Sequence, residues 1–115
     1  MNLQYFKGQI CEELKGARDY AKLAMATRVT DPSWSQHFTE MSAAELDHAN
    51  RLFKMAEQYY TGLTKEQQNG QDGRLYRCIV NLITEDGTKI KYMHQMIKNQ
   101  PMVVETTPAP VKAVG

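Results

Sequence analysis

The chain has 115 residues, enough for one domain with an ordinary buried core. Hydrophobic residues make up 42% of it and charged residues 23%, a balance typical of folded proteins that excludes a disordered one. Fourteen basic residues nearly offset thirteen acidic ones, and the net charge is +1. We therefore expect no nucleic-acid partner, because such a partner calls for a basic excess on one face.

Cysteine use and hydropathy exclude further classes. Cys11 and Cys78 are the two cysteines, and neither belongs to a CxxC pair, so we expect neither a disulfide framework nor a zinc site. No apolar run reaches the roughly 18 residues that span a membrane. The polar N-terminal residues predict no signal peptide, so a cytoplasmic protein is expected.

Three long helices are predicted, over about 3–28, 32–60 and 74–99. The first is rich in good helix formers. Asp31 or Thr30 can cap the second, with Pro32 at its first position. A glycine-rich break over 61–73 precedes the third helix, which ends before Pro101. No segment alternates as a strand would, so the fold class is all-α.

Residues 1–100 are expected to form one helical domain, followed by a flexible tail over 101–115. Three prolines lie among small residues in this tail: Pro101, Pro108 and Pro110.

Acidic and histidine side chains interrupt the apolar stripe of each predicted helix near its middle. Glu13 interrupts the first stripe, and Glu45 and His48 interrupt the second. In the third, Asp86 lies on the stripe and Glu85 flanks it. A buried carboxylate costs several kcal/mol unless it is paired or binds a metal. Because Glu45 and His48 are three residues apart, they share one helix face and can point at one centre.

Carboxylates combined with one imidazole suit iron or manganese. Helical bundles hold such metals with a Glu from each of two helices and a Glu-x-x-His from each of two others. We therefore predict that Glu13, Glu45 and His48 are metal ligands, with Glu85 as the most plausible fourth. Asp86 is the alternative to Glu85, and either could instead lie on a solvated face or pair with Lys89. No catalytic side chain and no organic-cofactor motif is predicted.

Two segments resemble the ferritin-like superfamily, and its rubrerythrin branch most closely. In the first, Glu13 precedes Tyr20 by seven residues, and the second contains the Glu45-x-x-His48 motif. The resemblance is good over residues 3–60 and looser over 75–98, where the chain is similar to short, three-helix rubrerythrin-like proteins of bacteria and their phages. It implies a ferritin-like bundle with a di-iron or di-manganese centre. Such a centre reacts with O₂ or peroxide, or oxidises Fe(II).

The chain also departs from a full rubrerythrin. It has no second Glu-x-x-His after residue 60 and no rubredoxin-type CxxC pairs. The resemblance therefore implies a metal-binding bundle rather than a complete peroxidase, with electrons supplied by an external donor.

One Glu and one Glu-x-x-His make half of a dinuclear site. We therefore expect a homodimer or higher homo-oligomer, in which a symmetric partner completes both the site and the bundle. The competing arrangement is a site within one chain, completed by Glu85 or Asp86. The alternative function is that of a non-enzymatic structural or interaction protein, which could be encoded by a phage. Such a protein would keep the ferritin-like scaffold without a functional metal.

Overall fold

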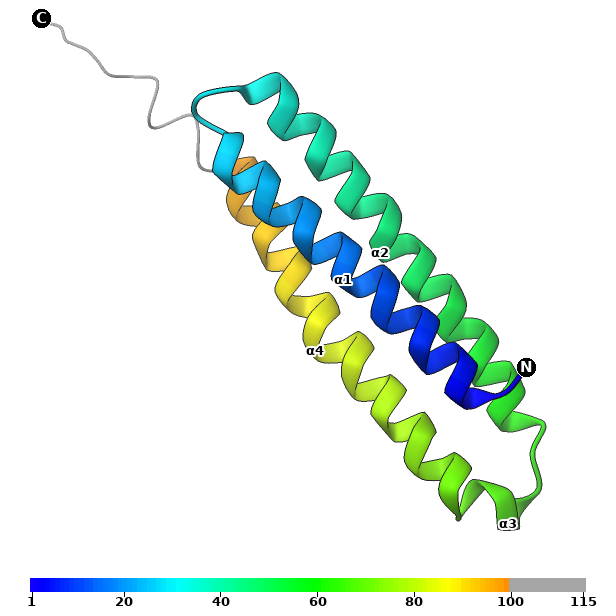
Figure 1. The fold of residues 1–115 in the computed structure, drawn as a ribbon. Helices are drawn as coiled ribbons and strands as arrows, with labels where there is room; N and C mark the ends of the chain where they lie inside the picture. The colour runs from blue at the N-terminus through cyan, green and yellow to red at the C-terminus, as the bar shows by residue number, and fades with distance from the viewer. Residues whose placement is uncertain (100–115) are drawn as a thin grey trace, which may run out of the picture.

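Three long helices lie side by side in the computed structural model, which describes residues 1–99 (Figure 1). They are α1 (Leu3–Thr27), α2 (Pro32–Thr61) and α4 (Gln71–Asn99). Helix α2 runs antiparallel to the other two, and α1 packs against both (Figure 1). The residues described contain no strand, which confirms the all-α fold. The expected tail over 101–115 lies outside the described residues.

The helix starts agree with the capping signals of the sequence. The Asp31 carboxylate accepts a hydrogen bond of 3.3 Å from the Trp34 backbone N–H, and Pro32 occupies the first turn of α2. This confirms the predicted cap, which satisfies a donor that would otherwise lack a partner at the helix end. At the start of α1, the Asn2 side chain accepts a bond of 2.9 Å from the Tyr5 N–H in the same way.

The break predicted over 61–73 is more structured than expected. It contains a fourth, single-turn helix, α3 (Lys65–Gln68), which begins with a capping box between Thr64 and Gln67. Helix α4 starts at Gln71, ahead of the predicted start at 74. Gly73, taken from the sequence as part of the break, lies buried in the first turn of α4. A Cβ atom at Gly73 would collide with the Gln68 carbonyl oxygen, so this close approach requires glycine.

Replacing Gly73 with alanine is expected to destabilise the protein by about 1–3 kcal/mol, because the turn after α3 must move to admit the methyl group. Chemical denaturation monitored by circular dichroism measures this change. Gly70→Ala is the matched control, since a Cβ at Gly70 meets its nearest atom at an ordinary 3.5 Å. Equal stabilities for the two variants would contradict the expected collision.

Small residues on α2 bring it close to α1. Ser35 Oγ donates a hydrogen bond of 2.6 Å to the Ala24 carbonyl, and Ser42 Oγ donates one of 2.6 Å to the Ala17 carbonyl. Since side chains this small leave the two backbones close together, the hydroxyls reach the carbonyls directly. The buried small residues of α2 recur every seven positions: Ser35, Ser42, Ala49 and Ala56.

Ser42 also ties α4 to this pair of helices. The hydroxyl proton of Ser42 is used on Ala17, so Ser42 Oγ accepts a hydrogen bond from His94 Nε2, at 2.7 Å. Burial lowers the pKa of His94, which keeps the ring neutral near pH 7. Helix α4 packs against α1 and buries three isoleucines: Ile79, Ile90 and Ile97.

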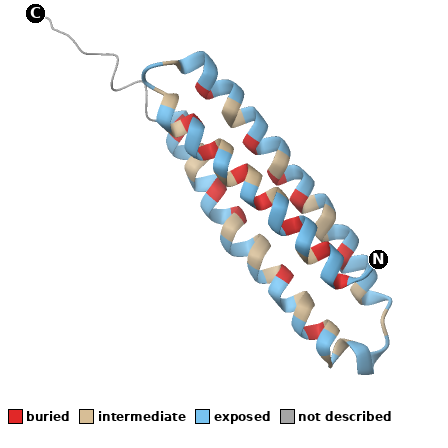
Figure 2. Ribbon diagram, viewed as in Figure 1, coloured by how far each residue is buried: buried red, intermediate tan, exposed pale blue. Residues whose placement is uncertain are grey.

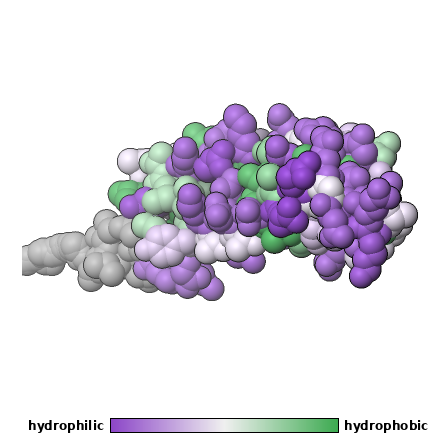
Figure 3. All heavy atoms as spheres, turned by 90° about the horizontal axis from the view of Figure 1, so that it is seen from below, coloured by the Kyte–Doolittle hydropathy of each residue, from purple (hydrophilic) through white to green (hydrophobic). Residues whose placement is uncertain are grey.

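The stripe predicted to face inward on α2 is rotated away from the core. The sequence places Met41, His48 and Met55 on this stripe, and all three are exposed. The buried face is the neighbouring one, which carries the small residues and Leu46 (Figure 2). On α1 and α4 the predicted stripes do face the core. The view of Figure 3 shows hydrophobic patches between hydrophilic side chains on the outside of the bundle.

Candidate metal centre

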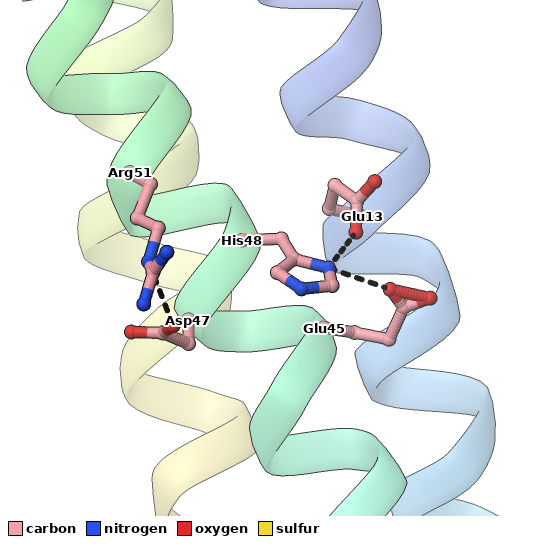
Figure 4. Close-up of polar contacts among 5 residues, drawn as sticks. All are labelled: Glu13, Glu45, Asp47, His48 and Arg51. Atoms are coloured by element: carbon pink, nitrogen blue, oxygen red, sulfur yellow. Dashed lines mark hydrogen bonds and ion pairs between the residues drawn. The ribbon is translucent and has the colours of Figure 1, made fainter.

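The structure brings Glu13, Glu45 and His48 together at the boundary between α1 and α2 (Figure 4). His48 Nδ1 lies 3.2 Å from Glu13 Oε1 and 3.6 Å from Glu45 Oε2. One potential ligand atom from each residue lies within 4.8 Å of those of the other two. The three side chains are therefore close enough to converge on a single cation with small rotamer adjustments.

Helix geometry explains this convergence. Glu45 and His48 are one turn apart on α2, so both side chains project from the same face toward α1. Glu13 projects from α1 to meet them (Figure 4). The side chains of Glu13 and Glu45 are 25% and 29% exposed, whereas that of His48 is 55% exposed. The cluster is thus backed by the bundle and open on one side.

The electrostatics of the cluster favour a positive charge between the carboxylates. A hydrogen bond with the Glu13 carboxyl raises the pKa of Glu45, and partial burial and the negative charge of Glu13 act in the same direction. His48 opposes this shift. Two carboxylates this close repel each other when both are ionised, so a proton shared between them, or a metal cation, stabilises the pair.

A family model for Rubrerythrin matches residues 7–102, which is most of the chain. The chain belongs to the rubrerythrin family. No curated protein and no solved structure matches it. The family match and the all-α bundle together show the ferritin-like architecture that the sequence motifs imply. Among residues 1–99, no helix is both long and apolar enough to cross a membrane.

Two other acidic side chains form ion pairs with arginines and do not belong to the rubrerythrin-type cluster. Asp47, next to His48, forms an ion pair with Arg51 on the outer side of α2, with 3.0 Å between Asp47 Oδ2 and Arg51 Nε (Figure 4). Asp86, an alternative ligand in the sequence analysis, lies 3.5 Å from Arg18 Nη1 and links α4 to α1. These pairs leave Glu13, Glu45 and His48 as the convergent group.

The fourth predicted ligand of this rubrerythrin-family chain does not join the group. Glu85 is exposed on α4, outside the cluster of three. Its role as a ligand stays a prediction. Both cysteines are also exposed, Cys11 on α1 and Cys78 on α4, and neither belongs to the cluster.

Proposed function

We propose that the protein binds iron or manganese through Glu13, Glu45 and His48. The observation that carries this proposal is the convergence of two carboxylates and one imidazole within 4.8 Å. This donor set fits the metals that the rubrerythrin family implies, because hard carboxylate oxygens with imidazole nitrogen suit iron and manganese. Such a metal supplies redox chemistry toward O₂ or peroxide, or the oxidation of further Fe(II).

The protein's own residues provide the geometry for this chemistry. His48 presents Nδ1 to the carboxylates, so it binds a cation through that nitrogen once its proton is lost. Glu13 and Glu45 offer four oxygens, enough to contact two cations at once. The sequence contains no CxxC pair that could relay electrons, so repeated turnover would require an external donor.

We further propose that a second copy of the chain completes the centre. A dinuclear site in a helical bundle takes a Glu from each of two helices and a Glu-x-x-His from each of two more. Glu13 on α1 and Glu45-x-x-His48 on α2 supply half of this set. The cluster is open on one side, so a two-fold axis at that opening would bring an identical half opposite it.

The apolar surface around the cluster supports this arrangement. Trp34, Met41 and Met55 are 57%, 42% and 47% exposed, a large exposure for such side chains. They recur every seven residues with His48, on one face of α2. This is the spacing of residues that pack between helices in a coiled coil. We call the surface formed by Trp34, Met41, Met55 and Tyr59 the α2 seam; a second copy would cover it and shield the metal from water.

Metal analysis of protein purified without chelator tests the proposal. We expect iron or manganese at up to about one ion per chain, as the shared site requires. Glu13→Ala, Glu45→Ala and His48→Ala should each reduce this content strongly. Glu12→Ala and Asp47→Ala are matched controls, because both carboxylates neighbour the ligands but lie outside the cluster. Unchanged content in all the ligand variants would show that these three residues are not the ligands. Wild-type protein that copurifies with no metal would favour a structural or interaction protein.

A further inference from the structure

We propose that Gly16 is a positioning residue, whose missing side chain lets the Glu45 carboxylate lie against α1 beside Glu13. A Cβ atom placed at Gly16 would lie 3.1 Å from Glu45 Oε1 and 3.4 Å from Glu45 Cδ. The nearest atoms to that position thus belong to one side chain, a member of the candidate metal centre. The inference rests on the proposed function, because it concerns the placement of a proposed ligand.

The register of the two helices explains the contact. Gly16 follows Glu13 by three residues on α1, so both face the same part of α2. Glu45 reaches across the gap between the helices and rests its carboxylate over the bare backbone at Gly16. Glycine is among the least favourable residues inside a helix. At Gly16, the missing Cβ leaves the space that the Glu45 carboxylate occupies.

The other glycine in the interior of α1 shows that this contact is specific. A Cβ atom at Gly8 would have no atom within 4 Å. Alanine at Gly8 therefore changes only the helix propensity of α1. Alanine at Gly16 changes the propensity equally and also fills the space of the Glu45 carboxylate. The two positions form a matched pair, which separates helix propensity from ligand placement.

A displacement of Glu45 affects metal binding far more than folding. The Glu45 side chain is flexible and partly exposed, so it can retreat from a new methyl group by a few tenths of an ångström at small cost. Metal–ligand distances, however, tolerate only about 0.2 Å of deviation. Gly16→Ala should therefore leave the fold intact and weaken the binding of a cation between Glu13, Glu45 and His48.

The experiment compares wild type, Gly16→Ala and Gly8→Ala by anaerobic titration with Mn(II), with thermal unfolding of the metal-free proteins alongside. We expect both variants to unfold at a temperature no lower than wild type. The Mn(II) affinity of Gly16→Ala should fall about tenfold, the scale seen when a residue supporting a ligand is changed. Gly8→Ala should bind Mn(II) as wild type does. Equal affinities for Gly16→Ala and wild type would overturn the proposal.

A second measurement needs no metal. The side-chain carboxyl ¹³C resonance of Glu45, recorded by NMR on the metal-free proteins, should shift in Gly16→Ala and stay unchanged in Gly8→Ala. If wild type binds no Mn(II), the proposed function fails, and this resonance alone still tests the contact. If the resonance does not move in Gly16→Ala, the positioning role of Gly16 is wrong whatever the metal content.

Discussion

Glu45→Gln is expected to raise the thermal stability of the metal-free protein at pH 7 and to abolish its stabilisation by Mn(II). In wild type, Mn(II) at a thousand times its Kd should add about 4 kcal/mol to the free energy of unfolding. For a domain of this size, that corresponds to a rise in Tm of about 20 °C. A variant that cannot bind the cation is not stabilised by it. Wild type should therefore become the more thermally stable of the two proteins when Mn(II) is added.

The stability gain without metal follows from the sign of the pKa shift. The pKa of Glu45 is raised in the folded protein, first by its hydrogen bond with Glu13 and then by partial burial. A group of this kind stabilises the fold below its unfolded pKa, and that contribution is lost as the pH rises through the folded pKa. At pH 7 the carboxylate therefore destabilises the metal-free fold. Glutamine keeps the shape and removes the charge.

Thermal unfolding at pH 7 and at pH 4, with and without Mn(II), makes this comparison. The advantage of metal-free Glu45→Gln should shrink at pH 4, where the wild-type carboxyl takes up its proton. Glu12→Gln is the matched control: it removes one exposed carboxylate next to Glu13 without touching the cluster. A Tm for Glu45→Gln that rises with Mn(II) as much as that of wild type would show that Glu45 is not a ligand.

The sequence predicted α1 and α4 well because their large apolar side chains face the core. On α2, the positions predicted to face the core are off by about one residue. The interpretation assumed that the larger side chains, such as Met41 and Met55, turn inward. In the structure the small ones, such as Ser42 and Ala49, do so. Small residues bring two helices close together, and a stripe chosen by hydrophobicity overlooks them. Met41 and Met55 are left on the outside of a single chain.

The candidate ligands were predictable for a different reason. Glu13, Glu45 and His48 are unusual residues at stripe positions, and their spacing survives a rotation of α2. The roles of glycines were not predictable in this way. From the sequence, Gly16 was only an unfavourable residue inside the first helix, and Gly73 was part of the break before the third. In the structure, each accommodates a neighbouring atom that a Cβ would crowd. Such contacts depend on which segment crosses the glycine, and a pattern within one helix does not reveal that.

The double variant Trp34→Lys/Met55→Lys is expected to convert the proposed dimer into a monomer and to remove the metal that we propose it binds. Both residues lie on the α2 seam. Trp34 is about three helical turns from Glu45, and Met55 is about two turns from His48. The added lysine charges therefore do not replace a cation at the cluster. Two lysines on each chain place four unpaired charges in the covered interface, and each costs several kcal/mol to desolvate. The dimer Kd should rise by at least about a thousandfold, which corresponds to about 4 kcal/mol.

The monomer itself should stay folded, because both side chains are already exposed in the single chain. Light scattering gives the oligomeric state, circular dichroism the helix content, and metal analysis the ion content. Tyr92→Lys/Met96→Lys is the matched control, since it adds the same charge at two exposed apolar positions on α4, away from the seam. A folded monomer that still holds two metal ions per chain would refute the shared centre. It would place the missing ligands within one chain, where Glu85 is the first residue to replace.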